Sequence, residues 1–148
     1  RLKLPKDQTF VDLGSGKGRI LLLAQLYGFK AIKGIEFSKD LCLTSKKNIA
    51  RFMSKTGLSS TIEILNIDAT SYVFDETDSV IFMYNPFNGD VFKQVVLNLK
   101  KSLELYPRKL TIIYMNPTET ATLEAYLDFS SVHRHTWNED YSIYTINP

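Results

Sequence analysis

Runs of strand-forming residues alternate along this chain with segments of helical periodicity, and no other feature limits its fold as much. Strands that alternate with helices pair in parallel and carry helices on both faces of one sheet. The sequence therefore predicts an α/β fold in three layers, built on a doubly wound, mostly parallel seven-stranded sheet. The expected strands are 9–13, 31–37, 61–67, 78–84, 109–115, 129–137 and 141–146, and the expected helices are 17–27, 39–55, 92–103 and 118–127.

The chain is expected to form a single domain over residues 1–148. Its last two strands are joined by Asn-Glu-Asp at 138–140, short enough for a C-terminal hairpin that puts an antiparallel strand into the sheet. Helix 17–27 is apolar nearly all round, so we expect it to be deeply buried. Only residues 1–8 precede the first strand, and we expect an N-terminal substrate or cap region to be missing.

The composition is that of an ordinary globular protein, with 44% apolar and 23% charged residues. No apolar run reaches the roughly 18 residues that a membrane-spanning helix needs, so no membrane partner is expected. The single cysteine, Cys42, excludes an internal disulfide, fits a reducing, cytoplasmic location and falls on the apolar side of a helix. His133 and His135 share one face of a strand without a carboxylate cluster nearby, so no metal site is expected.

The formal net charge is only +2, but the charges are unevenly distributed along the chain. Residues 1–74 carry 12 basic and 6 acidic side chains, whereas residues 75–148 carry 6 basic and 10 acidic ones. A solvated helix face is the simpler interpretation of the basic excess, and an anionic partner is the alternative. Much of that excess falls on helix 39–55, at Lys39, Lys46, Lys47, Arg51 and Lys55.

The stretch FVDLGSGKGRILLLAQ places Gly14, Gly16 and Gly18 between a strand and a helix. Glycine lets another molecule approach the backbone closely, and the following helix offers free N–H groups and the positive end of its dipole. This combination suits a nucleotide-like ligand or a carboxylate, and the alternative is a connection that binds nothing. The dinucleotide fingerprint G-x-G-x-x-G would need a glycine where Arg19 stands.

Ligands of such sheets bind beyond the carboxyl ends of the strands, so the residues just after each strand are the candidates. Glu36 ends the second strand, about 20 residues past the glycines, where a carboxylate can accept both hydroxyls of a ribose. Asp68 ends the third strand and can accept from the amino group of a base, with the N–H of Ala69 donating to a ring nitrogen. Taken alone, Asp68 is more simply an N-cap or turn aspartate.

The motifs VDLGSGKGR, GIEF, NIDA and YNPF, in this order and spacing, resemble those of class I S-adenosylmethionine-dependent methyltransferases. The likeness covers nearly the whole chain, including the closing hairpin, which in that family inserts an antiparallel seventh strand beside the fifth. It implies S-adenosyl-L-methionine as the cofactor, with the glycine turn along its methionine part, Glu36 on its ribose and Phe37 on its adenine. The implied cofactor-binding residues are Asp12, Gly14, Ser15, Gly16, Gly18, Glu36, Phe37, Asp68, Ala69 and Asn85.

In this family, amino-group methyltransferases often carry Asp/Asn-Pro-Pro-Tyr/Phe after the fourth strand. The resemblance therefore implies catalytic roles for Asn85, Pro86 and Phe87, with the side chain and a prolyl carbonyl accepting from the target nitrogen. One proline stands here instead of two, which puts nucleotide-base methylation in doubt and favours a protein side chain or a small molecule over nucleic acid. The alternative is that Asn85 merely ends a strand, as Asn116 does before Pro117.

The sequence thus predicts an S-adenosylmethionine-dependent methyltransferase whose methyl acceptor is a nitrogen atom. A neutral amide at position 85 suits nitrogen, whereas a hydroxyl acceptor would need a general base, and none is evident at a strand end. One alternative is a non-catalytic scaffold that keeps the fold and the cofactor. The other is an NAD(P)-dependent oxidoreductase, which Arg19 disfavours.

Overall fold

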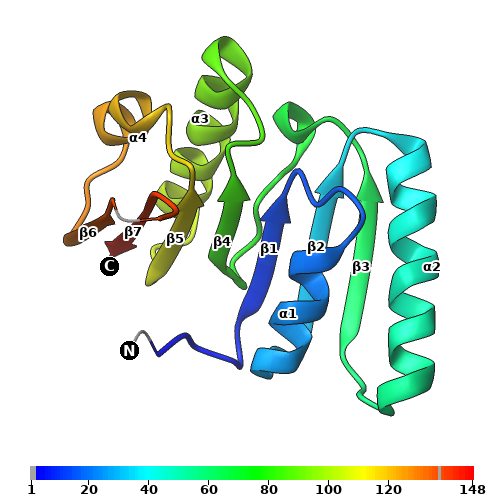
Figure 1. The fold of residues 1–148 in the computed structure, drawn as a ribbon. Helices are drawn as coiled ribbons and strands as arrows, with labels where there is room; N and C mark the ends of the chain where they lie inside the picture. The colour runs from blue at the N-terminus through cyan, green and yellow to red at the C-terminus, as the bar shows by residue number, and fades with distance from the viewer. Residues whose placement is uncertain (1–2, 137) are drawn as a thin grey trace.

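The computed structural model describes residues 3–136 and 138–148, and a seven-stranded sheet forms its centre (Figure 1). The strand order is β3-β2-β1-β4-β5-β7-β6, with β7 antiparallel to both β5 and β6 and the other neighbours parallel. This confirms the predicted sheet; of the expected strand 129–137, Trp137 lies outside the described residues. The strands are β1 (Thr9–Leu13), β2 (Ala31–Glu36), β3 (Thr61–Asn66), β4 (Asp78–Tyr84), β5 (Leu110–Met115), β6 (Ser131–His135) and β7 (Tyr141–Ile146).

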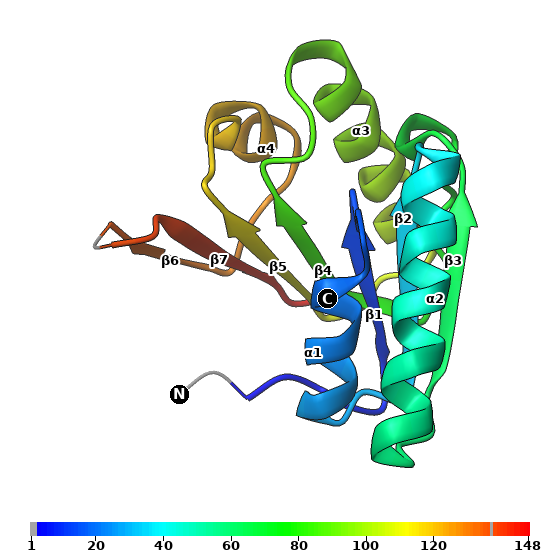
Figure 2. The same cartoon turned by 45° about the vertical axis from the view of Figure 1, so that its right-hand side comes forward.

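Helices cover both faces of the sheet, α1 and α2 on one face and α3 and α4 on the other (Figures 1 and 2). Ser38 caps α2 by accepting from the N–H of Leu41, and Gly57 ends that helix in the left-handed conformation. No helix in the described part of the chain is long and apolar enough to cross a membrane. The helices are α1 (Arg19–Tyr27), α2 (Lys39–Thr56), α3 (Gly89–Leu105) and α4 (Thr120–Tyr126), with a short 3-10 helix, η1 (Ala69–Ser71), before β4.

Alternate residues of each strand point to opposite faces of the sheet and fill two separate cores. In β4, Ile81 packs toward α3 and α4, whereas Val80 and Phe82 pack toward α1 and α2. Cys42 and Ile49 of α2 are buried, and Cys42 was expected on the apolar side of its helix. The predicted helix 92–103 lies within α3, whose Phe92, Val95, Val96 and Leu99 are buried.

The expected deep burial of helix 17–27 is wrong, because Leu23 and Leu26 of α1 are 50% and 57% exposed. The helix packs against the sheet and against α2, which covers only part of its surface. No described helix lies over β5 and β7 on this side of the sheet (Figures 1 and 2). An open hollow of about 500 Å³ there exposes part of Ile113 and Met115. Leu23 and Leu26 lie on the helix face opposite the buried residues Leu21, Ala24 and Gln25, so the outer face of α1 is apolar but uncovered.

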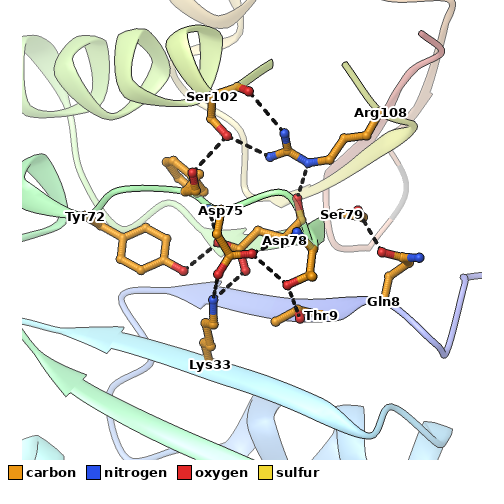
Figure 3. A network of polar contacts seen from close by, with 11 residues as sticks. Gln8, Thr9, Lys33, Tyr72, Asp75, Asp78, Ser79, Ser102 and Arg108 are labelled. Carbon is orange, nitrogen blue, oxygen red and sulfur yellow. Dashed lines mark hydrogen bonds and ion pairs between the residues drawn. The ribbon is translucent and has the colours of Figure 1, made fainter. Parts of the chain in front are cut away.

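A partly buried network of polar and charged side chains lies toward the amino ends of β1, β2 and β4 (Figure 3). Asp78 is completely buried, and its carboxylate accepts from Lys33 Nζ at 2.9 Å and from the Tyr72 hydroxyl at 2.7 Å. Lys33 also pairs with Asp75. Burial opposes ionisation of Asp75, but the hydrogen bond from Lys33 is the largest of the effects that lower its pKa, to about 2. The network therefore joins β2 to β4 through fully paired charges.

Arg108 extends this network to the end of α3. Its Nε donates to the carbonyl of Asp78 at 2.9 Å, and its Nη2 donates to the Ser102 hydroxyl at 3.1 Å. Ser102 in turn donates to the carbonyl of Phe74 at 2.9 Å. Strand β4 and helix α3 are thus tied together at the edge of the sheet that lies away from the glycine turn.

We expect Lys33→Met to lower the free energy of unfolding by about 3 kcal/mol, because Asp78 would keep a buried charge without its cation. The exposed Lys30, just before β2, provides the control, and Lys30→Met should change stability by less than about 0.5 kcal/mol. Urea unfolding of both variants at pH 7 measures the difference. Equal losses in the two variants would show that the Lys33–Asp78 pair does not stabilise the fold.

Candidate cofactor and acceptor site

Residues at the ends of four parallel strands meet at the carboxyl edge of the sheet and line two adjoining hollows, here called the strand-end cleft. The first, of about 350 Å³, is lined by Gly14, Gly16, Ile35, Glu36, Phe37, Leu41, Ile67, Ala69, Pro86 and Phe87. The second, of about 300 Å³, is lined by Phe37, Asp68, Ala69, Pro86, Phe87, Asn88 and Val91. Four expected residues, Asp12, Ser15, Gly18 and Asn85, do not line either hollow.

The three glycines of the turn meet three different surroundings, although all have positive φ angles. A Cβ added to Gly14 would lie 2.7 Å from the Cβ of Pro86, so this glycine lets the loop after β4 approach the turn. A Cβ on Gly18 would collide with the hydroxyl of Ser45, so that glycine permits close packing of α2. A Cβ on Gly16 would meet nothing within 4 Å. Gly16 is therefore the position at which the turn is open to a ligand.

Glu36 holds the glycine turn and the start of α2 together. Its Oε2 accepts from the N–H of Gly16 at 2.9 Å, and its Oε1 accepts from the N–H of Ser38 at 2.8 Å. The N–H groups of Gly14 and Ser15 donate to the carbonyl of Ile35. The N–H groups of Gly14, Ser15 and Gly16 are thus used within the protein. A carboxylate has about four lone-pair sites, so each oxygen of Glu36 retains capacity for a further donor.

Asp12 lies beneath the turn with 3% of its surface exposed. Burial, together with the nearby charge of Glu36, raises the pKa of Asp12 to about 7. Ser15 is also buried, with its side chain packed against Gly34 of β2, and its hydroxyl has no hydrogen-bond partner among the described residues. Asp12 and Ser15 thus support the turn from below, and the cleft wall itself is formed by Gly14 and Gly16.

Asp68 is the N-cap of η1, as its simpler interpretation predicted. Its Oδ1 accepts from both the N–H and the hydroxyl of Thr70, and these two bonds lower the pKa of the exposed carboxyl. Capping does not exclude ligand binding, because both bonds go to Oδ1. Across the cleft stands Phe37, which is 76% exposed, although a lone aromatic ring at a strand end is normally covered. Its ring and Ala69 line both hollows.

Asn85 comes directly after β4 with φ 39°, in the left-handed region, immediately before Pro86. Its N–H donates to the carbonyl of Met115, and its Oδ1 accepts from the hydroxyl of Thr118 at 2.7 Å. An amide oxygen has two lone pairs, so one stays available at Oδ1. Phe87 is half-buried and packs against the core on the α3 side while lining the cleft.

Thr118 is the functional candidate that sequence reasoning missed. It lies in the loop after β5, where the hydroxyl of the buried Tyr114 accepts from the N–H groups of Thr118 and Glu119. Glu119 in turn accepts from the N–H of Gly89, at the start of α3. The sequence feature that could have pointed to Thr118 was the Asn116-Pro117 pair at the end of β5. Strands β4 and β5 are adjacent, so the residues that follow them must lie close together.

Comparison with known protein families shows that the model of the family described as "Histone methylation protein DOT1" matches residues 1–146. Comparison with curated protein sequences gives no match. Solved structures with the same fold include an RNA methyltransferase from Salinibacter ruber in complex with S-adenosyl-L-homocysteine. It has a TM-score of 0.70 and 19% identity over 95% of this chain and 81% of that one.

Two further solved structures share the fold. One is the ribosomal protein L11 methylase from Lactobacillus delbrueckii subsp. bulgaricus, with a TM-score of 0.69 and 13% identity over 95% of this chain and 70% of that one. The other is the N-methyltransferase NodS from Bradyrhizobium japonicum, with a TM-score of 0.67 and 10% identity over 93% of this chain and 84% of that one. At such low identity these structures establish the fold, and the acceptors in their names belong to those proteins.

Gly16→Ala should leave the protein folded but weaken binding of S-adenosylhomocysteine at least tenfold, because the new methyl group would occupy the open face of the turn. The backbone strain of an alanine at φ 53° should lower the free energy of unfolding by only about 1–2 kcal/mol. Gly14→Ala should instead lower stability by roughly 2–4 kcal/mol, since it adds a collision with Pro86. Urea unfolding and the thermal shift with S-adenosylhomocysteine separate the two effects. Unchanged binding by Gly16→Ala would contradict the assignment of the turn.

Asp12→Asn should stabilise the cofactor-free protein at pH 8 but not at pH 4. The native pKa of Asp12, about 7, lies above its ordinary value of 3.8, so the native state holds this proton more tightly than the unfolded state. Stability from this group is therefore lost as pH rises from about 4 through 7, at about 1.4 kcal/mol per pH unit.

Unfolding free energies of the wild type and the Asn variant, measured from pH 4 to 8 without cofactor, test this pH dependence. Asp68→Asn is the control, since the pKa of Asp68 is lowered and its contribution does not change above about pH 5. Parallel pH profiles for the wild type and Asp12→Asn would show that Asp12 ionises normally.

Proposed function

Because the chain belongs to the DOT1 histone methylation protein family, and is therefore an S-adenosylmethionine-dependent methyltransferase, we propose that its methyl acceptor is a nitrogen atom. The acceptor is an amine of a protein side chain or of a small molecule. The observation that carries this proposal is the Asn85 amide, which Thr118 holds in one orientation at the end of β4. The family match decides against the oxidoreductase alternative.

The strand-end cleft fits the cofactor. Gly16 offers open backbone, Glu36 retains acceptor capacity at the rim, and the exposed ring of Phe37 provides a surface on which a base can pack. Asp68 and Ala69 lie at the far end, where they would meet the edge of the adenine ring. In this assignment Asp12, Ser15 and Gly18 keep the turn in shape, and Gly14 lets Pro86 close the cleft.

When bound, S-adenosylmethionine would supply a methyl carbon on a positively charged sulfur: a nitrogen lone pair would bond to that carbon, and the neutral sulfur would leave with the electrons of the broken C–S bond. The task of the protein is to hold the acceptor N–H groups and to leave the lone pair free. In this proposal, the remaining lone pair of Asn85 Oδ1 and the carbonyl of Pro86 accept those N–H groups; the hydrogen bond from Thr118 to Oδ1 supports the role of Asn85. Phe87 limits the space beside them. The residues that line the cleft include no histidine, and its two carboxylates, Glu36 and Asp68, are assigned to the cofactor.

Asn85→Ala should lower turnover by on the order of 10²-fold while leaving cofactor affinity nearly unchanged, since it removes one positioning acceptor. The matched control is Asn116→Ala. Asn116 also precedes a proline and has φ 46° at the end of the adjacent strand, so both changes carry a similar backbone strain. Tritium-labelled S-adenosylmethionine and host extract provide the assay, with label followed into protein, nucleic-acid and small-molecule fractions.

The expected product is an acid- and base-stable N-methyl group in protein or small molecules. Label recovered as an ester or an ether would refute the nitrogen assignment. Equal loss of turnover in the two asparagine variants would remove the special role of Asn85. Tight binding of S-adenosylhomocysteine without label in any fraction would favour the non-catalytic scaffold.

A further inference from the structure

The loop that carries the candidate acceptor site, residues 85–89, is held at both ends by two neighbouring residues of the loop after β5. At its start, the hydroxyl of Thr118 donates to Asn85 Oδ1 at 2.7 Å. At its end, the N–H of Gly89 donates to Glu119 Oε1 at 3.0 Å. We call residues 85–89 the acceptor loop and the two residues that hold it the clamp. The clamp therefore fixes the acceptor loop on both sides of the residues that line the cleft.

One phenol group holds both residues of the clamp. The hydroxyl of Tyr114 accepts from the N–H of Thr118 at 3.3 Å and from the N–H of Glu119 at 3.2 Å. Pro117, just before them, has no N–H group. In the part of the chain that the structure describes, neither N–H group of the clamp has another acceptor. The backbone N–H groups of the clamp therefore depend on Tyr114 for their hydrogen bonds.

The ring of Tyr114 is itself fixed between the sheet and α3. It is completely buried and stacks on Phe92, with the ring centroids 5.6 Å apart and the ring planes at 21°. A phenylalanine could fill the same space, so packing does not account for the hydroxyl. A buried hydroxyl costs free energy unless it is hydrogen-bonded, and the bonds that this one makes are those to the clamp. The hydroxyl thus couples the clamp to the rigid centre of the fold.

From this chain of contacts we infer that Tyr114 is a positioning residue for methyl transfer, because it holds the clamp and the clamp holds Asn85. The inference rests on the proposed function, in which Asn85 Oδ1 accepts an N–H of the acceptor. An amide that turns about its last torsion presents its NH2 group instead of its oxygen. A misplacement of about 1 Å can lower a rate by on the order of 10²-fold. Tyr114 and the clamp do not line the strand-end cleft, so the cofactor should bind without them.

The rate of label transfer from tritium-labelled S-adenosylmethionine to host extract, at saturating cofactor, tests this inference. Tyr114→Phe should lower that rate by at least about tenfold, whereas the Kd of S-adenosylhomocysteine should change by less than about twofold. Thr118→Val should lower the rate similarly, and Thr118→Ser, which keeps the hydroxyl, should recover most of it. The double variant Tyr114→Phe with Thr118→Val should be no slower than the slower single variant, because both changes act through one chain of contacts.

The matched control is Tyr144→Phe. Tyr144 is also completely buried, in the adjacent strand β7, and its hydroxyl donates to Glu124 Oε1 at 3.1 Å. This change should lower the melting temperature about as much as Tyr114→Phe but leave the rate near that of the wild type. Equal loss of rate in the two tyrosine variants would overturn the inference, because lost stability would then explain it. Fully additive losses in the double variant of Tyr114 and Thr118 would overturn it as well.

Hydrogen exchange followed by mass spectrometry, without cofactor or acceptor, separates a failure of this inference from a failure of the proposed function. Peptides that cover the acceptor loop and the clamp should exchange at least about tenfold faster in Tyr114→Phe and at the wild-type rate in Tyr144→Phe. Unchanged exchange in Tyr114→Phe, or full turnover by it beside a slow Asn85→Ala variant, would overturn the inference and leave the proposed function standing. Full turnover by Asn85→Ala would overturn the proposed function and the inference with it.

Discussion

The contact between Gly14 and Pro86 is the constraint on which the rest of the site depends. Because Gly14 lacks a Cβ, the ring of Pro86 can pack directly against the turn. A Cβ at position 14 would lie only 2.7 Å from the Cβ of Pro86. The contact brings the loop after β4 against the turn after β1, and these strands are neighbours at the centre of the sheet. The turn after β1 and the loop after β4 can approach each other this closely because position 14 is a glycine and a proline fixes φ in the opposing loop.

Two carboxyl groups support this arrangement in different ways. Glu36 accepts from two backbone N–H groups, one in the glycine turn and one at the start of α2. Asp12 lies deeper, and its pKa is raised to about 7 by burial and by the charge of Glu36. A positively charged group bound near the turn would favour the ionised form of Asp12 and would itself be bound more tightly. The affinity for such a group and the protonation of Asp12 would then be coupled.

The sequence could predict the features that topology imposes, because parallel strands must end at one edge and the residues after them must meet there. It could not predict distances between loops. The bond from Thr118 to Asn85 joins positions 33 residues apart, and no local pattern marks it. The environment of each glycine depends on which helix or loop packs against it, so spacing alone could not separate Gly16 from Gly14 or Gly18. The burial expected for helix 17–27 failed because the outer face of α1, with Leu23 and Leu26, has no element packed over it in the described part of the chain.

The amino edge of the sheet holds interactions that stabilise the fold, whereas the carboxyl edge holds the candidate functional site. The amino edge holds the ion pair of Lys33 and the completely buried Asp78, which also accepts from the Tyr72 hydroxyl. The carboxyl edge instead holds features that cost free energy: Asn85 and Asn116 in the left-handed conformation and a buried carboxyl at Asp12. Strained loops persist only where surrounding structure fixes them. Strand β4 begins at Asp78 and ends just before Asn85. The same strand is therefore anchored by the network at the amino edge and fixes the start of the loop that carries the candidate acceptor site.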